Sequence, residues 1–203
     1  MPATIYTIGH SIHKVETFLA LLEQHSIGVV ADVRSAPFSR RHPQFSRGNL
    51  TASLAGAGIE YQFFGKELGA RSEDASCYEG GKVQYERLAE TDLFRQGIAR
   101  LLELASGSQR VALLCAEKEP LQCHRTILVS RRLARLGVAV AHILATGELE
   151  SHAAAMLRLV ELLKLPAVDL FRTEADVIEE AYRLQGQRIA YAREETQNVI
   201  IGP

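Results

Sequence analysis

The chain of 203 residues carries 23 lysines and arginines against 24 aspartates and glutamates, and 47% of its residues are hydrophobic. This balance excludes the global basic excess of non-specific nucleic-acid binders, and the length suits one well-buried domain rather than two independent cores. Three cysteines at low density favour a reducing compartment over a disulfide scaffold. We see no secretory signal and no apolar run that could span a bilayer, so we expect a cytoplasmic protein without a membrane partner.

The first half of the chain predicts strands that alternate with helices and loops. Residues 4–8 and 27–33 are apolar runs typical of buried strands, and residues 15–25 between them have helical spacing. Residues 34–54 predict a long loop with a short helix near its end, and residues 59–63 alternate like a strand. Residues 65–81 predict an irregular stretch, and residues 85–105 predict one helix.

The second half continues this alternation and then becomes helical. Residues 110–115 predict a third buried strand, residues 123–136 a helix that Gly137 ends, and residues 138–144 a last strand. Helices over residues 148–163 and 173–190 are expected to pack on the flank. The pattern predicts an α/β fold with a mostly parallel, doubly wound, Rossmann-like sheet. We divide the single domain into a core (4–145), a C-terminal helical extension (146–190) and a tail (191–203).

The residues that follow the predicted strands are the candidates for a functional site. In an open parallel sheet, ligands bind beyond the carboxyl ends of the strands, so these residues are expected to meet. The rule selects, in chain order, His10, Ser11, Asp32, Arg34, Cys115, Glu117, Cys123, His124 and Arg125.

The two cysteines of this set have a functional and a structural interpretation. Cys123 lies near a predicted helix start, where free backbone amides and the helix dipole favour a thiolate, and Arg125 adds positive charge. Cys123 is therefore a candidate nucleophile or metal ligand, and Cys115 a candidate partner. The alternative is that both are small core residues, because free cysteine is among the most buried residue types.

The acidic and histidine candidates remain open in the same way. Glu117 directly follows a buried strand, where a carboxylate without a partner is unfavourable. It is therefore either a functional acid or base, or the structural partner of Arg34 or Arg125. Asp32 has the same two interpretations with Arg34. His10 and His124 are candidate acid/base groups or ligands, whereas His142 lies among apolar neighbours in a predicted strand and is expected to be a core histidine.

A cationic loop and a set of metal-binding residue types complete the candidates. Residues 39–45 contain Arg40, a second arginine and an aromatic ring, so this loop is expected to hold a phosphate or a nucleic-acid backbone unless it is simply a solvated surface. Cys115, Cys123 and His124 are acceptable ligands for a divalent transition metal such as zinc, although their spacing matches no zinc signature. A redox pair of the two cysteines lacks a thioredoxin-like motif.

Several of these segments, taken in order, resemble a known family. The segments are Thr7-Ile8-Gly9-His10-Ser11, Asp32-Val33-Arg34 with Ser35 and Pro37, Gly58 to Tyr61, Leu68-Gly69, and Cys115-Ala116-Glu117 with Cys123-His124-Arg125. Over residues 4–145 they look like the bacterial and archaeal family called domain of unknown function 488, and the helical tail with Phe171 and Tyr182 is similar to that of its longer members. The chain departs from the family's Leu-Gly-Gly at Ala70. The resemblance implies an α/β fold and a shared site at the strand ends, without an activity.

These observations lead to three hypotheses about function. The first is an enzyme that acts on an anionic substrate, such as a nucleotide, a nucleic acid or a phosphorylated molecule, with Arg34 and Arg125 binding the anion and Glu117 or Asp32 as acid or base. The second is a non-catalytic module that binds nucleic acid or protein. The third is a metal or thiol sensor at Cys115 and Cys123.

Overall fold

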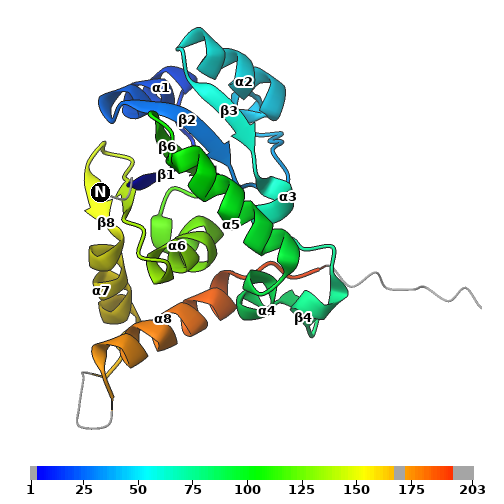
Figure 1. The fold of residues 1–203 in the computed structure, drawn as a ribbon, viewed down its shortest axis with the longest axis vertical. Coiled ribbons are helices and arrows are strands. Elements are labelled where there is room, and N and C mark those ends of the chain that lie inside the picture. Colours follow the sequence, from blue (N-terminus) through cyan, green and yellow to red (C-terminus); the bar gives the residue numbers. More distant parts are fainter. Residues whose placement is uncertain (1–3, 167–171, 194–203) are drawn as a thin grey trace, which may run out of the picture.

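A six-stranded sheet forms the centre of the protein (Figure 1). The computed structural model describes residues 4–166 and 172–193. The sheet order is β3-β2-β6-β1-β7-β8, in which the first five strands run parallel and β8 pairs antiparallel with β7. The predicted α/β class with a mostly parallel sheet is confirmed. The strands are β1 (Ile5–Gly9), β2 (Ile27–Asp32), β3 (Glu60–Phe63), β6 (Arg110–Cys115), β7 (Val140–Ile143) and β8 (Leu149–Ser151).

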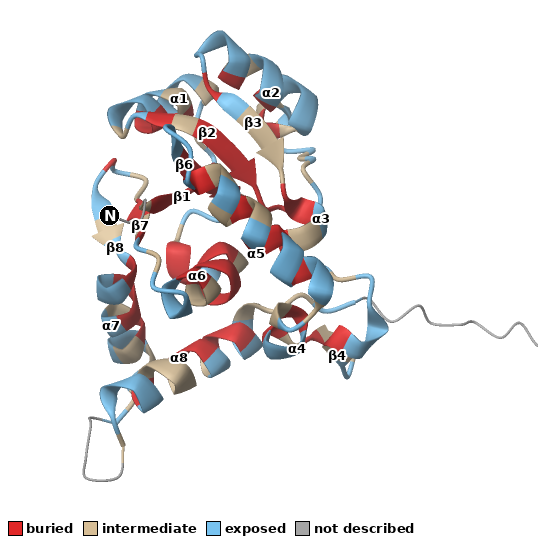
Figure 2. Cartoon of the chain, viewed as in Figure 1, coloured by how far each residue is buried: buried red, intermediate tan, exposed pale blue. Residues whose placement is uncertain are grey.

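Helices cover both faces of this sheet. On one face, α1 (Val15–Gln24) and α2 (Arg47–Gly56) bury Phe18, Leu50 and Leu54 against the sheet. The opposite face packs against α5 (Asp92–Ala105), α6 (Arg131–Arg135), α7 (His152–Leu163) and α8 (Glu174–Ile189). Because water meets neither face, β2 is an almost continuous apolar run, and Figure 2 shows it buried along nearly its whole length.

Shorter elements connect these layers. Beside the sheet, β4 and β5 form a two-stranded hairpin, and residue 192 bridges to β5. Residues 191–193, which the sequence suggested as the start of a tail, are therefore paired with the rest of the chain. The connecting elements are η1 (Pro43–Phe45), α3 (Gly65–Leu68), η2 (Ala75–Cys77), β4 (Tyr78–Glu79), β5 (Lys82–Val83), α4 (Tyr85–Ala89), η3 (Pro120–Gln122) and the π-helical η4 (Arg125–Ser130).

Helix α5 shows how local sequence and packing agree. Thr91 precedes it in extended conformation, and its side chain accepts a hydrogen bond from the backbone N–H of Phe94. Phe94, Ile98 and Leu101 follow at helical spacing, and all three are buried against the sheet. Burying each such side chain contributes about 1.5–3 kcal/mol relative to leaving it in water. The cap and the apolar face therefore specify the same helix.

The structure corrects the prediction at three places. The single helix predicted over residues 85–105 is two helices, because the Thr91 cap starts a new one. The helix predicted over residues 148–163 begins only at residue 152, because residues 149–151 form the edge strand β8 and Ser151 caps α7. Residues 65–81, predicted as irregular, contain α3, η2 and β4. Gly137 does end the helix before it, with a φ of 76° that L-residues rarely adopt.

The C-terminal helices join the sheet through a buried chain of hydrogen bonds. Thr7 Oγ1 lies 2.8 Å from His142 Nδ1, His142 Nε2 lies 3.0 Å from His152 Nδ1, and His152 Nε2 lies 2.6 Å from the Tyr182 hydroxyl. The prediction that His142 is a hydrogen-bonded core histidine is therefore confirmed. Phe171 lies outside the described residues. Across residues 4–166 and 172–193, no helix has both the length and the apolar character needed to cross a membrane.

The buried hydrogen bonds of His142 and His152 predict how the free energy of unfolding depends on pH. Burial lowers the pKa of His152 to about 4 and that of His142 to about 2, so both are neutral when folded. The pKa of both histidines is 6.5 in the unfolded state, so between pH 6.5 and the folded-state values the unfolded protein binds more protons than the folded one. The free energy of unfolding is therefore highest above pH 6.5 and falls as the pH is lowered. We expect urea unfolding to show a decline of up to about 1.4 kcal/mol per pH unit for each histidine.

The variant His152→Gln serves as the control for this measurement. It removes one of the two titrating groups, and the buried His10, whose shift has the same sign, is kept in both proteins. The variant should therefore lose stability less steeply between pH 6.5 and 5. Equal slopes in the two proteins would contradict the proposed linkage.

Candidate functional site

The loops after β1, β2 and β6 meet at one edge of the sheet. These three strands are neighbours, with Gly9 opposite Cys115 and Asp32 opposite Leu114. Past the strand ends, the backbone N–H of His10 donates to Cys115 O at 2.9 Å, and that of Ser11 donates to Ala116 O at 2.9 Å. The structure therefore brings the selected strand ends together, as the strand-end rule predicts.

Two thiols and one imidazole form a cluster at this edge. The Sγ atoms of Cys115 and Cys123 and a ring nitrogen of His124 all lie within 4.8 Å of one another. His124 Nε2 lies 3.0 Å from the carbonyl oxygen of Val33, which can only accept, so Nε2 carries the proton and Nδ1 is free to accept one. Nδ1 lies 3.7 Å from Cys115 Sγ and 4.0 Å from Cys123 Sγ.

Cys123 is the thiol with anionic character. Burial alone raises its pKa, but the hydrogen bond from Cys115 and the nearby Arg125 bring the pKa well below its ordinary value. The backbone N–H of Arg125 also donates to Cys123 Sγ at 3.5 Å, because Cys123 lies just before the helical turn η4. The hydrogen bond to Cys123, followed by burial, raises the pKa of Cys115 well above its ordinary value. Of the two thiols, Cys123 is therefore the one that loses its proton more readily.

Arg125 supports the cluster from within the core. Its side chain is fully buried, and Nη1 donates to the backbone oxygen of Glu117 at 2.6 Å while Nη2 lies 3.4 Å from that of Lys118. No carboxylate of the described chain lies within ion-pair distance of its guanidinium. A buried cation favours a nearby anion, and the positive charge of Arg125 lowers the pKa of Cys123. Arg125 thus lies behind the site rather than in its open part.

Gly9 makes this arrangement possible. A Cβ atom at this position would lie 1.8 Å from the oxygen of Glu117 and 3.1 Å from Arg125 Nη1. Any side chain would therefore push away the loop that Arg125 holds. By contrast, Ala70, at the position where the resemblance predicts glycine, is buried and does not adopt a positive φ, so an alanine fits the turn.

Asp32 and Arg34 form a buried ion pair. Arg34 Nε and Nη2 donate to the two carboxylate oxygens of Asp32 at 2.9 and 2.6 Å, and the Tyr61 hydroxyl donates to Asp32 Oδ2 at 2.8 Å. Arg34 Nη1 donates to the backbone oxygen of Phe45 at 2.9 Å. Asp32 is fully buried and its oxygens are occupied. The structural interpretation of the Asp32–Arg34 pair is therefore the one that the geometry supports.

Glu117 has a different environment from the one expected. Of its two interpretations, the structural pair with Arg34 or Arg125 is wrong: Arg34 pairs with Asp32, and Arg125 contacts only the backbone oxygen of Glu117. The Glu117 side chain is exposed and makes no hydrogen bond or ion pair within the part of the chain that the structure describes. Glu117 lines the same hollow as Cys115 and Cys123.

His10 and Ser11 form the wall on the side of β1. His10 is buried and stacks on Phe45 with ring centroids 4.4 Å apart. Its Nδ1 donates to Ser11 O at 2.9 Å, which leaves Nε2 as an acceptor, and burial together with Arg34 lowers its pKa to about 4. His10 is thus neutral near pH 7. Ser11 adopts a φ of 50°, which turns the chain sharply after β1.

Two adjoining hollows open at this edge and share the walls made by Arg34, Ala36, Ala116 and Glu117. The first, of about 290 Å³, contains Cys115, Cys123 and His124, and we call it the thiol pocket. The second, of about 600 Å³, contains His10, Ser11 and the arginine loop, and we call it the cationic basin. Sequence reasoning missed several residues of the thiol pocket, because nothing local marks them: Arg71, Tyr85, Gln122, Ile189 and Tyr191.

The cationic loop is only partly as expected. Arg40 is exposed and lines the basin together with Arg41 and Lys118. Phe45, the aromatic residue of the predicted binding loop, is fully buried between His10 and Phe18. It therefore belongs to the core and is not available to a ligand.

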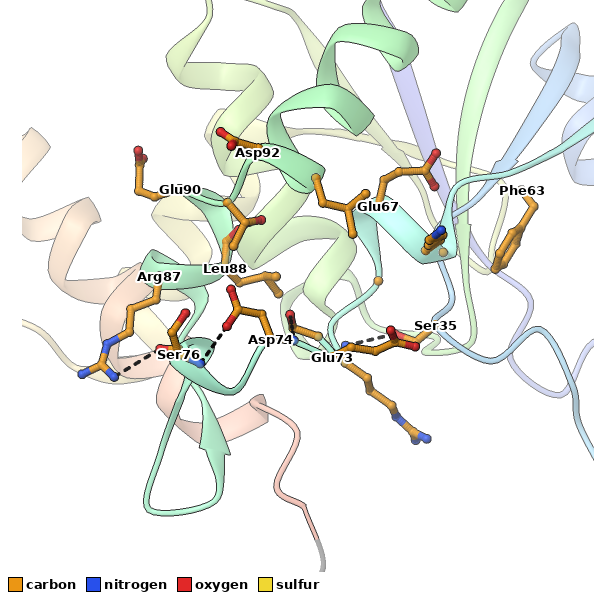
Figure 3. A pocket seen from close by; sticks show the side chains of 17 residues that line it. Ser35, Phe63, Glu67, Glu73, Asp74, Ser76, Arg87, Leu88, Glu90 and Asp92 are labelled. Atoms are coloured by element: carbon orange, nitrogen blue, oxygen red, sulfur yellow. Dashed lines mark hydrogen bonds between the residues drawn. The ribbon is translucent and has the colours of Figure 1, made fainter.

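A larger hollow of about 840 Å³ lies next to the site, between α3, α4 and the turn at η2 (Figure 3). It is rich in carboxylates, and most of them have a partner within the protein. Asp74 accepts from the backbone N–H of Ser76 at 2.8 Å, Glu67 pairs with Arg100, and Glu90 with Arg95. Its lining contains no cysteine or histidine. The chemistry-bearing groups therefore collect in the thiol pocket and the cationic basin instead.

The thiol pair predicts a pH profile for alkylation. The measurement uses a protein in which Cys77 is replaced by Ala, so that only two thiols remain. We expect iodoacetamide to label Cys123 before Cys115, and the pH at which the labelling rate of Cys123 is half-maximal should lie below the ordinary thiol pKa of about 8.5. Replacing Cys115 by Ala removes a hydrogen bond to the thiolate, so the profile should move to higher pH. Mass spectrometry of labelled peptides between pH 5 and 9 measures both. Equal labelling of the two cysteines would contradict the assignment.

The buried ion pair predicts a large stability effect. Asp32→Asn leaves the Arg34 cation buried without its counter-charge, which costs about 3–5 kcal/mol in the free energy of unfolding. Tyr61→Phe removes only one hydrogen bond and should cost about 1 kcal/mol. Urea unfolding of both variants at pH 7 measures the difference. An Asp32→Asn protein as stable as the parent would show that Arg34 does not depend on this carboxylate.

The comparisons with known proteins give a family and no further relative. Residues 14–132, more than half of the chain, match the family model described as domain of unknown function DUF488. The matched segment contains β2, β3 and β6 and the whole segment from Cys115 to Arg125, and it begins just after His10 and Ser11. No curated protein and no solved structure matches the chain. The chain therefore belongs to the DUF488 family.

Proposed function

We propose that this protein is an enzyme in which the Cys123 thiolate attacks an anionic substrate held in the thiol pocket and the cationic basin. The observation that carries the proposal is the set of groups that stabilises negative charge on Cys123, namely Cys115, the backbone N–H of Arg125 and the buried guanidinium of Arg125. A thiolate rather than a thiol is the nucleophile in cysteine chemistry. Here it lies in the wall of an open pocket.

The surrounding groups suggest a division of roles. Cys123 Sγ would form a bond to the electrophilic atom of the substrate while the bond to the leaving group breaks. Glu117, exposed and unpaired within the described chain, would deliver the proton to the leaving group and remove it from the second nucleophile. Cys115 and His124 would hold the sulfur in place, and Arg40 with Lys118 would attract the negative charge of the substrate.

Charge balance favours a nucleophile over a metal ligand. A single thiolate neutralises the buried Arg125 cation, so the metal-free cluster carries no net charge. A divalent metal bound by two thiolates would neutralise both sulfurs and leave Arg125 without an anion, because no carboxylate of the described chain reaches its guanidinium. The Asp32–Arg34 pair is already neutral by itself and offers no surplus charge.

One observation favours a second candidate, a metal centre with Cys115, Cys123 and His124 as ligands. His124 donates its outer N–H to the Val33 carbonyl, which is how metal-binding histidines are usually oriented. Two thiolates and one imidazole facing a pocket resemble the ligand set of catalytic zinc, which keeps a fourth position for substrate. A protein of this kind would be purified with about one metal ion per chain.

Three variants test the proposal. Cys123→Ser and Glu117→Gln should abolish turnover of a candidate anionic substrate, while the exposed position of Glu117 should leave the melting temperature nearly unchanged. Cys115→Ser keeps a hydrogen-bond donor and should reduce turnover by a smaller factor. Intact-protein mass spectrometry of Glu117→Gln with a substrate whose leaving group departs without a proton should show an adduct on Cys123, because the first half of the reaction then needs no acid and the second half lacks its base.

Elemental analysis separates the two candidates. A nucleophilic Cys123 predicts no stoichiometric zinc and one rapidly titrating thiolate per chain. The metal centre would be supported instead by one zinc per chain that is lost in each of the variants Cys115→Ser and Cys123→Ser. In that case zinc should also protect both cysteines of the parent protein from alkylation, and the nucleophile proposal would be wrong. If Glu117→Gln unfolds the protein, its carboxylate is structural and its role as acid and base is wrong.

A further inference from the structure

The rim of the cationic basin carries two unusually exposed apolar side chains. Ile12 is 79% exposed and Phe38 is 69% exposed, which are the highest exposures among the large hydrophobic residues of the described chain. They come from different loops, after β1 and after β2, and both line the same hollow. Single exposed apolar residues are common, but two that converge on one hollow beside a candidate catalytic site indicate a surface that contacts a flat or apolar group.

The same rim carries cations without partners. Arg40, Arg41 and Lys118 line the basin, and none of them pairs with a carboxylate anywhere in residues 4–166 and 172–193. Elsewhere on the surface, arginines such as Arg87 and Arg158 are paired with glutamates. Arginine and lysine side chains free of carboxylates bind phosphate well, and arginine can do so through two parallel hydrogen bonds.

We propose that the cationic basin binds a nucleotide unit, with its planar base against Phe38 and Ile12 and its phosphate between Arg40, Arg41 and Lys118. A volume of about 600 Å³ falls in the range of small-molecule sites and suits one such unit. A free nucleotide and the end of a single strand share this chemistry. A bare phosphate or a sugar phosphate would leave the two apolar side chains in water.

The shared walls connect this ligand to the thiols. Arg34, Ala36, Ala116 and Glu117 line both the basin and the thiol pocket, so a nucleotide in the basin lies next to Cys123. The inference therefore names the substrate class of the proposed enzyme and rests on that proposal for the reaction. Binding itself depends only on the rim.

Titration calorimetry with four probes tests the inference: adenosine 5′-monophosphate, ribose 5-phosphate, inorganic phosphate and a 5′-phosphorylated ten-nucleotide DNA strand. Stacking of a base on an aromatic ring contributes about 1–3 kcal/mol, so the nucleotide should bind about 5- to 150-fold more tightly than ribose 5-phosphate. Phe38→Ala should abolish this difference, and Phe38→Tyr should restore it. Arg40→Ala with Arg41→Ala should weaken all four probes and reduce the salt dependence.

Leu162→Ala is the matched control, because Leu162 is a 63% exposed apolar residue on α7 outside the basin, and it should change none of the affinities. If the DNA strand binds more tightly than the mononucleotide and with a steeper salt dependence, the natural ligand is the end of a nucleic-acid strand. If the two bind equally, the ligand is a free nucleotide. Equal affinity for adenosine 5′-monophosphate and ribose 5-phosphate, or binding that Phe38→Ala leaves unchanged, overturns the inference. So does the absence of binding by any probe.

Calorimetry with the nucleotide and alkylation of Cys123, both measured on the parent protein, separate this inference from the proposed enzyme. Nucleotide binding without any Cys123 adduct or turnover leaves the basin assignment standing and removes the enzyme proposal. A reactive Cys123 in a protein that binds no nucleotide removes the basin assignment alone.

Discussion

The rest of the site depends on the hydrogen bonds that the buried guanidinium of Arg125 makes to the backbone of the loop after β6. Arg125 lies at the start of the helical segment after β6 and reaches back to the backbone oxygens of residues 117 and 118, so it closes the loop between the two cysteines. The absence of a side chain at Gly9 lets this loop approach β1. No carboxylate in the described chain reaches the guanidinium, and its charge lowers the pKa of Cys123. One side chain thus links backbone geometry to the reactivity of Cys123.

The C-terminal helices contribute to the same loop from the other side. Gln185 on α8 donates to the backbone oxygen of Leu121 at 2.7 Å, and Arg158 on α7 pairs with Glu119, whose carboxylate caps η3. Tyr191, just beyond α8, lines the thiol pocket. Figure 1 shows α7 at the side of the molecule below β8, and α8 running across the lower part toward α4. The helical extension therefore positions the segment before Cys123 as well as covering the sheet.

The two hollows divide the site by chemistry. The thiol pocket holds the only pair of neighbouring thiols in the described chain, whereas the basin holds cations and exposed apolar side chains. Arg34 lies in the wall between them and is neutralised by Asp32, so it shapes this wall more than it attracts ligands. An arrangement in which recognition and reaction occupy adjoining spaces lets loop side chains vary the ligand without disturbing the nucleophile.

Local sequence determined the strands, most helices and the edge of the sheet where the site lies. Residues 110–115 were predicted as a strand with the bounds that the structure has, because an apolar run between polar residues depends only on its own side chains. That His10, Asp32 and Cys115 meet also followed from the strand-end rule, since parallel neighbours share an edge. Only the tertiary structure decided the partners: Arg34 with Asp32 rather than Glu117, Phe45 in the core, and Tyr191 at the pocket. Partner choice depends on the sheet order and on distances between segments far apart in the chain, and no local pattern encodes either.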